Sequence, residues 1–438
     1  MAARCLSRLV AMSLYARVDG APTSYLMQRL APFGLDLHEF PGTGWGIRTL
    51  HDRPGGERVF SWSNKEVVLA EVVLRRREDL AAAAVHAAEA GRPLTDESLL
   101  ACYIVAEERE GRDTWFTLYR STLPAFQPSA ISSAGPGDRA LLPRCYSCCV
   151  KATYDYATKQ HAACAAALGA VDEPVPELDR YLRAFAAVRA RSFALDEVVF
   201  RLGQPSPLVA QRPDGLRRAL LPLYDLLNHS SGARTRIERS EGTWRLLSED
   251  SCAAGGQVFN SYGDDRSNLE LLLHYGFAVA GNGRAGIGFD VPDLLGALAA
   301  VCPRVFGDSR VRDSLRRRLA ADEARRRAEA LQDLALYSLD VSGGAPRPDG
   351  RLRAALDNFQ HMAVPLGCTE EEARALPAVA LDAMLRVRRD ELVARLEEVG
   401  RDVEVVAADR AGGCWRDHVV TFLKAEREAI EGVIKEAE

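Results

Sequence analysis

The sequence predicts an α+β protein: a β fold of short strands that a helical insert divides, followed by an all-helical C-terminal domain. Three observations predict this class. Short strand and hairpin patterns occupy residues 42–74 and 217–280. Between them, residues 75–194 are rich in Ala and Leu at helical spacing, and after Gly281 the chain consists of long amphipathic segments. With 438 residues the chain also exceeds the usual limit of a single core, so two domains are expected.

The first strand-like region contains glycines at alternate positions. In FPGTGWGIRTL, residues 40–50, Gly42, Gly44 and Gly46 precede an apolar run. Glycine at this spacing allows a close backbone approach to a ligand, or simply bends a strand. The G-x-G-x-x-G spacing of a dinucleotide site is absent. We expect the small β unit to continue through VVLAEVVL, residues 67–74.

Three further local patterns are clear. Residues 23–30 predict a short helix with its leucines on one face. Residues 236–247, RIERSEGTWRLL, predict a β-hairpin with its turn at the serine and glycine in the middle. Ser267, followed three residues later by Glu270, predicts the capping box of a helix.

Polar residues lie where apolar elements end. PLYDLLNHSSG, residues 222–232, closes an apolar run with Asp225, Asn228 and His229. Tyr262 follows the strand-like QVFNS and precedes a glycine, so its hydroxyl is expected at a strand end. A core tyrosine bonded to the backbone fits the same pattern, and a lone histidine after a strand is more often structural than catalytic. The grouping of several such residues favours a functional site.

Composition excludes several classes of protein. Lys and Arg total 56 against 61 Asp and Glu, and the net charge of -5 argues against a nucleic-acid-binding protein with a global basic field. No apolar run reaches the roughly eighteen residues of a membrane span. Ten cysteines are too few for a disulfide scaffold, and reduced core thiols in an intracellular compartment are expected. The CYSCC segment, residues 145–149, lacks a second cysteine pair, so no metal site is expected.

The N-terminus leaves the compartment open. The first eighteen residues contain three arginines and no acidic residue, which fits an organelle transit peptide as well as an irregular terminus. A cytoplasmic location is expected, with a plastid or mitochondrion as the alternative.

In this order the motifs resemble the SET-domain protein methyltransferases, in the branch of the plant Rubisco large-subunit lysine methyltransferase and the actin-histidine methyltransferase. DLLNHS, residues 225–230, resembles the D-x-x-N-H-S segment of that branch. SYGDDRSNLELLLHYGF, residues 261–277, resembles its Y-G-x-x-S-N-x-E-x-x-x-x-Y-G-F segment. GTGWG, residues 42–46, stands where the family has its first glycine-rich strand. The resemblance covers nearly the whole chain from about residue 23.

The resemblance implies a domain organisation. It consists of an N-terminal tail or transit segment at 1–22, a SET domain at 23–282 with its helical insert at about 75–194, and a helical substrate-binding domain at 283–438. In this fold the N-H-S segment and the tyrosine strand form a knot-like crossing, which is rare in proteins.

The resemblance also implies S-adenosylmethionine as methyl donor and a protein as acceptor, with no metal. The implied cofactor-binding residues are Thr43, Gly44, Trp45, Arg201, Asp225, Asn228, His229, Tyr262, Tyr275 and Phe277. Arg201 and Asn228 are expected to hold the amino-acid end of the cofactor, and Tyr262 is expected to be the catalytic residue. Thr43 departs from the family pattern, because a glutamate is usual at this position.

Three functions follow from these expectations. Protein-lysine N-methylation is the first, and protein-histidine N-methylation through the same cleft is the second. Gly203 decides between neither, because lysine enzymes tend to have an aromatic residue there and the histidine enzyme an asparagine. A non-catalytic SET-like binding module is the third, which the presence of Tyr262, Asn228 and His229 disfavours. We expect a monomer that binds a protein substrate and neither nucleic acid nor membrane.

Overall fold

In the computed structural model of the chain, the described residues form two compact units. Met1–Gln127 and Tyr154–Asp264 bound the first unit, and Pro128–Thr153 and Asp265–Glu438 bound the second. The described residues are 21–41, 43–110, 139–196, 200, 202, 204–212, 214–240, 242–263, 266–282, 286–329, 337–341, 347–405 and 413–437. The N-terminal tail up to residue 20, with the expected transit segment, lies outside this set, as do Gly42, Arg201 and Gly203. The predicted domain boundaries stay a prediction.

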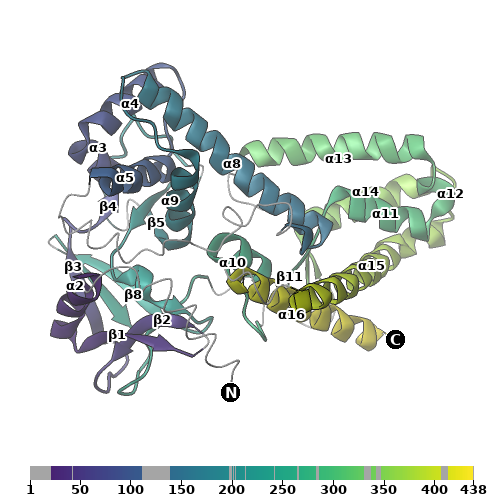
Figure 1. The fold of residues 1–438 in the computed structure, drawn as a ribbon. Coiled ribbons are helices and arrows are strands. Elements are labelled where there is room, and N and C mark those ends of the chain that lie inside the picture. Colours follow the sequence, from purple (N-terminus) through teal and green to yellow (C-terminus); the bar gives the residue numbers. More distant parts are fainter. Residues whose placement is uncertain are drawn as a thin grey trace. The chain divides into compact units, whose positions relative to one another are not determined.

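The described residues of the first unit form four small sheets of short strands (Figure 1). These sheets are β1 (Leu35–Phe40) with β2 (Gly44–Thr49); β3 (Arg58–Ser63), β9 (Thr243–Ser248) and β8 (Thr235–Ser240); β4 (Val68–Leu69), β6 (Leu216–Leu220) and β5 (Ser192–Asp196); and β7 (Asn228–His229) with β10 (Phe259–Asn260). Trp62 of β3 lies opposite Trp244 of β9, and their stacked rings are 6.3 Å apart in the core. β8 and β9 form the predicted hairpin, with Gly242 at a φ of 81° in its turn.

The described residues of the insert between the strands of the first unit are mainly helical, as predicted. The helices are α3 (Ala70–Arg76), α4 (Glu78–Glu89), α5 (Asp96–Glu110), α9 (Leu178–Arg191) and the later part of α8 (Arg144–Gly169), and α2 (Ala21–Leu30) precedes them. The expectation of strand throughout residues 67–74 was wrong, because only Val68 and Leu69 pair in a sheet and the helix α3 follows at once. A short apolar run does not distinguish strand from helix, and the Ala and Glu at the start of α3 favour helix.

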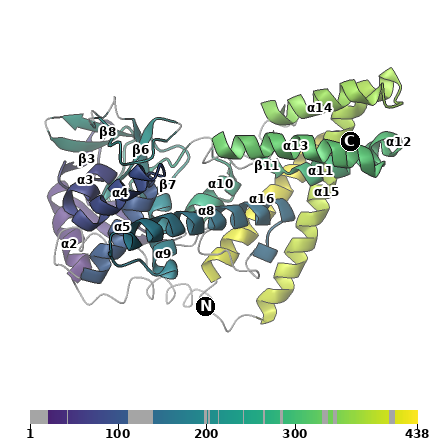
Figure 2. The ribbon, with the colours of Figure 1, turned by 90° about the horizontal axis from the view of Figure 1, so that it is seen from above.

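The second unit is mainly helical, as predicted (Figures 1 and 2). Its helices are α10 (Asn268–Tyr275), α11 (Val291–Val301), α12 (Pro303–Phe306), α13 (Ser309–Glu329), α14 (Gly350–Ala363), α15 (Glu370–Val405) and α16 (Gly413–Ala437). It also contains a sheet that the sequence pattern did not reveal, formed by β11 (Gly286–Phe289), β12 (Tyr337–Asp340) and β13 (Arg347–Pro348). The long amphipathic segments expected after Gly281 therefore do not account for Tyr337–Asp340, which pair with β11 instead of continuing a helix. Among the described residues, no helix is long and apolar enough to cross a membrane.

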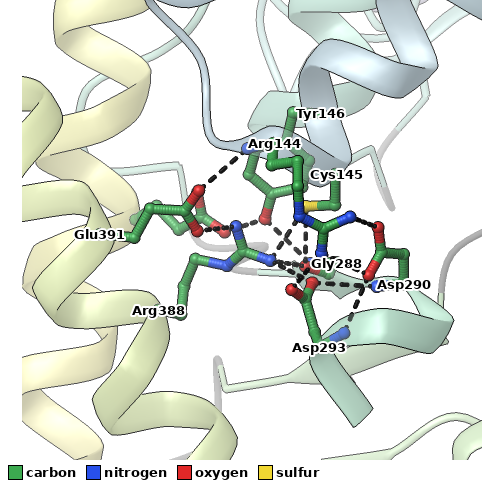
Figure 3. Close-up of polar contacts among 9 residues, drawn as sticks. Arg144, Cys145, Tyr146, Gly288, Asp290, Asp293, Arg388 and Glu391 are labelled. Atoms are coloured by element: carbon green, nitrogen blue, oxygen red, sulfur yellow. Dashed lines mark hydrogen bonds and ion pairs between the residues drawn. The ribbon is translucent and has the colours of Figure 1, made fainter. Parts of the chain in front are cut away.

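A buried arginine joins three elements of the second unit (Figure 3). Arg388 of α15 is 2% exposed. Its Nη2 donates to the Asp293 carboxylate of α11 at 2.9 Å, to the Gly288 carbonyl of β11 at 3.0 Å and to the Cys145 sulfur of α8 at 2.9 Å. Its Nη1 donates to Glu391 one turn along α15 at 2.8 Å. These bonds compensate the guanidinium for the water that burial removes.

Arg144, at the start of α8, extends this network. Its guanidinium donates to the Asp290 carboxylate at 2.5 Å and to the Asp293 carboxylate at 2.7 Å, and its backbone N–H donates to Glu391 at 2.9 Å. Arg144 therefore ties the first turn of α8 to both α11 and α15.

A glutamate of α16 lies in the same core. The Tyr146 hydroxyl of α8 donates to the Glu426 carboxylate and accepts from the Gly288 N–H at 3.0 Å. The Arg388 guanidinium lies 5.0 Å from the centre of the Tyr146 ring and 5.3 Å from that of Phe289. Burial raises the pKa of Glu426 to about 7, although Arg388 acts in the opposite direction. A carboxyl group with a pKa near neutral thus lies where α8, α15 and α16 meet.

Candidate active site

Two short strands bring the two polar motifs of the first unit together. β7 and β10 pair in parallel, with Asn228 opposite Phe259 and His229 opposite Asn260. A parallel pair needs a long connection between its strands, and the β8–β9 hairpin lies within it. Tyr262 follows two residues after β10. The D-x-x-N-H-S segment and the tyrosine segment are therefore neighbours in space.

Gly46 leaves the space that the side chain of Asn228 occupies. The Asn228 Nδ2 donates to the Trp45 carbonyl of β2 at 3.0 Å. At Gly46, the next residue of β2, a Cβ atom would lie 2.7 Å from Asn228 Nδ2 and 2.3 Å from Gln257 Nε2. Any other residue would displace these two amides, so a glycine is needed here for close packing.

Tyr262 is held by both its backbone and its hydroxyl. Its N–H donates to His229 Nδ1 at 3.1 Å, and the two rings lie 5.3 Å apart. Because Nδ1 accepts this bond, the neutral His229 ring carries its proton on Nε2. The Tyr262 hydroxyl donates to the Leu227 carbonyl at 2.9 Å. Gly263 follows at a φ of 134°, which L side chains rarely adopt, so the chain turns sharply directly after the tyrosine.

The loop before β7 is strained and anchored. Leu223 has a φ of 72° and a ψ of -38°, although it is not a glycine. Asp225, two residues later, has a fully buried side chain, and Arg191 Nη1 lies 3.3 Å from its carboxylate and 3.2 Å from its carbonyl oxygen. Arg191 at the end of α9 therefore fixes the start of the D-x-x-N-H-S segment, and backbone strain of this kind gathers at functional sites.

Asn260 of β10 is a buried residue that sequence reasoning did not single out. It is 4% exposed, and its Oδ1 accepts from the Tyr224 hydroxyl at 2.9 Å and from the Thr235 hydroxyl at 2.7 Å. The available signal was an asparagine inside an otherwise apolar strand. Such a residue needs buried partners, because an unsatisfied buried amide is costly.

Thr43 lies beside the same glycine-rich strand. Its hydroxyl donates to Gln257 Oε1 at 3.0 Å. The Nε2 atom of Gln257 is buried and has no hydrogen-bond partner in the described part of the chain. Gly44 begins β2 beside it. Gln257 was also missed, because a glutamine before a strand carries no motif of its own.

Tyr275 and Phe277 belong to the second unit. The predicted capping box is present: Ser267 and Glu270 exchange bonds at the start of α10, and Gly276 ends the helix at a φ of 81°. The rings of Tyr275 and Phe277 lie 6.2 Å apart, and Phe277 also packs edge to face with His418 of α16 at 6.4 Å.

The structure thus brings Trp45, Asn228, His229 and Tyr262 together within the first unit. Arg191 anchors Asp225 at the start of the same segment. No group of three or more His, Cys, Asp or Glu side chains among the described residues is arranged to hold a metal ion.

Known structures share this arrangement of elements. Rubisco LSMT bound to sinefungin and monomethyllysine matches with a TM-score of 0.58 at 16% identity, over 94% of this chain and 90% of that one. The SET domain of LSMT bound to lysine and AdoHcy matches with a TM-score of 0.57 at 14% identity, over 95% and 91%. Rubisco LSMT bound to AdoMet matches with a TM-score of 0.55 at 16% identity, over 95% and 92%.

The chain has the SET-domain fold of these methyltransferases. The likeness extends over both units, so the SET fold and the helical C-terminal region are both confirmed. No known family model matches the sequence.

Sequence relatives agree over a shorter stretch. The N-lysine methyltransferase setd6 of Xenopus laevis is 34% identical over 101 residues, which cover 23% of this chain and 21% of that protein. The protein of the same name from Xenopus tropicalis is 37% identical over 59 residues, or 14% and 13% of the two chains. The matched region therefore spans about a fifth or less of these curated relatives.

Proposed function

We propose that this SET-domain protein is an S-adenosylmethionine-dependent protein-lysine N-methyltransferase. The observation that carries the proposal is the pairing of β7 with β10, which groups Asn228 and His229 with Trp45 and Tyr262. The family resemblance assigns cofactor binding and catalysis to these four residues. A scaffold without activity has no need for a strained loop that presents them together.

The residues around β2 fit the amino-acid end of the cofactor. The Asn228 amide donates to Trp45 and retains a carbonyl oxygen that is suited to an ammonium group. The buried Gln257 Nε2, which has no partner among the described residues, is suited to a carboxylate. Gly46 leaves the space that both amides occupy. When bound, S-adenosylmethionine supplies an electrophilic methyl group on a sulfonium.

Tyr262 is proposed to orient the acceptor amine. A lysine side chain must lose a proton before its nitrogen lone pair attacks, and its ordinary pKa is about 10.4. The Tyr262 oxygen donates to the Leu227 carbonyl at 2.9 Å, and a phenol that donates in this way still accepts from an amine N–H. Aligning the lone pair is the main requirement of an in-line displacement, so positioning by a half-buried hydroxyl is sufficient.

The choice of lysine is supported by the relatives. Their names describe N-lysine methyltransferases, and two of the matching solved structures hold lysine or monomethyllysine. We propose that the helical C-terminal region recognises the protein that carries the acceptor, and that the cytoplasm is the compartment.

The test is methyl labelling with a matched variant. The full chain is incubated with a cell lysate and S-adenosylmethionine that carries a radioactive methyl group, and the labelled protein is hydrolysed to amino acids. We expect methyl-lysine. Tyr262→Phe is expected to lower the labelling rate by at least about tenfold, because it loses the positioning hydroxyl, while the cofactor Kd from calorimetry changes by less than about threefold.

Three outcomes would contradict the proposal in separate ways. No detectable affinity for S-adenosylmethionine would favour the binding module. Methyl-histidine without methyl-lysine would favour the histidine enzyme. Undiminished labelling by the Tyr262→Phe variant would remove Tyr262 from the reaction.

A further inference from the structure

Two thiols of the second unit face each other at close range. Cys302 stands between α11 and α12, and Cys368 stands just before α15. Their sulfur atoms are 3.1 Å apart, although 66 positions separate the residues in sequence. A disulfide bond has a length of about 2.05 Å, so its formation requires the sulfurs to approach by only about 1 Å.

The backbone on both sides holds this approach in place. The Cys302 N–H donates to the Leu298 carbonyl at 2.9 Å, which ends α11, and the Cys368 N–H donates to the Ala363 carbonyl at 3.0 Å, which closes the turn after α14. Both segments are thus fixed by hydrogen bonds to the helices that precede them.

An ion pair beside the thiols joins the same two segments. The Arg304 guanidinium of α12 donates to both carboxylate oxygens of Glu372 at 2.7 and 2.8 Å. Glu372 in turn accepts from the Thr369 N–H at 2.8 Å, at the start of α15. The close approach of the two sulfurs is therefore part of a contact between α12 and α15 that the ion pair stabilises.

The two thiols differ in access. Cys302 is partly exposed, whereas Cys368 is 7% exposed. Burial and, to a lesser extent, the neighbouring Cys302 sulfur together raise the pKa of Cys368 to about 11. A dissolved oxidant therefore reacts with Cys302 first. Cys368 lies close enough to attack the oxidised sulfur of Cys302 afterwards.

We propose that Cys302 and Cys368 are a reversible redox modification site, at which exchange with a small disulfide of the glutathione class forms an intramolecular disulfide. The Cys302 thiolate attacks one sulfur of the small disulfide, and one small thiol leaves with a proton. The Cys368 sulfur then attacks the Cys302 sulfur of the mixed disulfide, and the second small thiol leaves. The protein loses two protons and two electrons, and the small disulfide gains them as it becomes two thiols.

This disulfide would link the connection between α11 and α12 covalently to the residues just before α15. The enclosed segment contains α12, α13, β12, β13 and α14. Closing so long a loop restricts the unfolded chain strongly, so the oxidised protein is expected to unfold at a higher temperature.

The experiment uses the full chain and glutathione disulfide at pH 8. After incubation, free thiols are alkylated and the protein is digested and analysed by mass spectrometry. We expect a cross-linked peptide pair that contains Cys302 and Cys368 and that dithiothreitol abolishes. The unfolding temperature is expected to rise by at least about 5 °C on oxidation, and this rise should vanish in Cys302→Ser and in Cys368→Ser.

Cys148→Ser is the matched control, because Cys148 is an exposed thiol on another helix. It is expected to keep both the cross-link and the rise in unfolding temperature. The proposal is overturned if glutathione is found on Cys302 while Cys368 remains open to alkylation. It is equally overturned if wild-type protein forms cross-links between other cysteines but none between these two.

Discussion

At the scale of single residues, the candidate site depends on Gly46, because this residue has no Cβ atom. Gly46 lacks the Cβ that would collide with Asn228 Nδ2 and Gln257 Nε2. Both colliding atoms end flexible side chains, so a substitution is tolerated by the fold at small cost, whereas the amides must move. Gly46 therefore allows Asn228 to keep its position and its hydrogen bond to the Trp45 carbonyl.

Gly46→Ala is therefore expected to separate binding from folding. The alanine methyl displaces the Asn228 amide, so the Kd for S-adenosylmethionine should rise by about tenfold or more, since a lost hydrogen bond to a charged group is worth about 1.5–3 kcal/mol. The free energy of unfolding should fall by no more than about 2 kcal/mol. Calorimetry and urea unfolding measure the two quantities.

Gly232→Ala is the control for this substitution. Gly232 follows the same segment, and a Cβ atom there meets no other atom within 4 Å. Its cofactor affinity should equal that of the wild type. Equal affinity in the Gly46→Ala protein would show that the close packing around Asn228 plays no part in binding.

At the scale of elements, α16 is held to α8 and α15 through a carboxyl group that titrates near neutral pH. Glu426 accepts from Tyr146 and lies near Arg388, and burial raises its pKa to about 7. Carboxylates of Asp293 and Glu391 face the same arginine. Since the folded pKa lies above the ordinary value of 4.5, the folded protein keeps the Glu426 proton over a range in which the unfolded chain loses it.

The stability of the second unit is therefore expected to fall as the pH rises from about 4.5 to about 7. The Glu426 contribution is complete below pH 4.5 and lost above pH 7, and the difference between these pKa values corresponds to about 3 kcal/mol. Glu426→Gln removes the titration. The variant should gain stability relative to the wild type through this window, as measured by urea unfolding at a series of pH values.

The exposed residue Glu428 lies two positions further along α16 and provides the control. Glu428→Gln should leave the difference from the wild type nearly constant across the same pH values. If Glu426→Gln behaves like Glu428→Gln, Glu426 does not retain its proton in the folded protein.

At the scale of the whole molecule, local signals predicted local features well. The hairpin of β8 and β9, the capping box of α10 and the helical insert follow from turn residues, spacing and periodicity, which neighbouring residues decide. The sheet of β11, β12 and β13 was not predicted, because its strands are short and β11 pairs with β12 across 48 or more positions. Pairing over such distances leaves no local pattern.

The candidate site shows the same division. Its motif residues were predicted from their resemblance to a known family, and Asn228, His229 and Tyr262 do lie together. The residues that support them, Arg191 and Gln257, were not predicted, because each acts through a contact with a distant part of the chain. Such contacts exist only after the strands have paired.

The two units are also interleaved in sequence, which leads to a prediction about truncation. Leu141 and Leu142, just before α8, and Val150 in its first part belong to the core of the second unit. A fragment that ends at residue 264 lacks α11, α15 and α16, so these side chains lose their cover. We expect the fragment to aggregate in size-exclusion chromatography, and changing all three residues to serine should restore a soluble species. A monomeric, unmodified fragment would contradict this expectation.

Because the two units are interleaved in sequence, parts of the second unit are synthesised at widely separated times. Val150 emerges long before Val419 of α16, which belongs to the same core, and 269 positions separate them. At about 5 to 20 residues per second, synthesis of the intervening chain takes roughly 13 to 54 s. Throughout that interval the apolar side of the first turns of α8 has no partner from α16. We expect a nascent chain of this kind to bind chaperones that protect exposed apolar helices until translation ends.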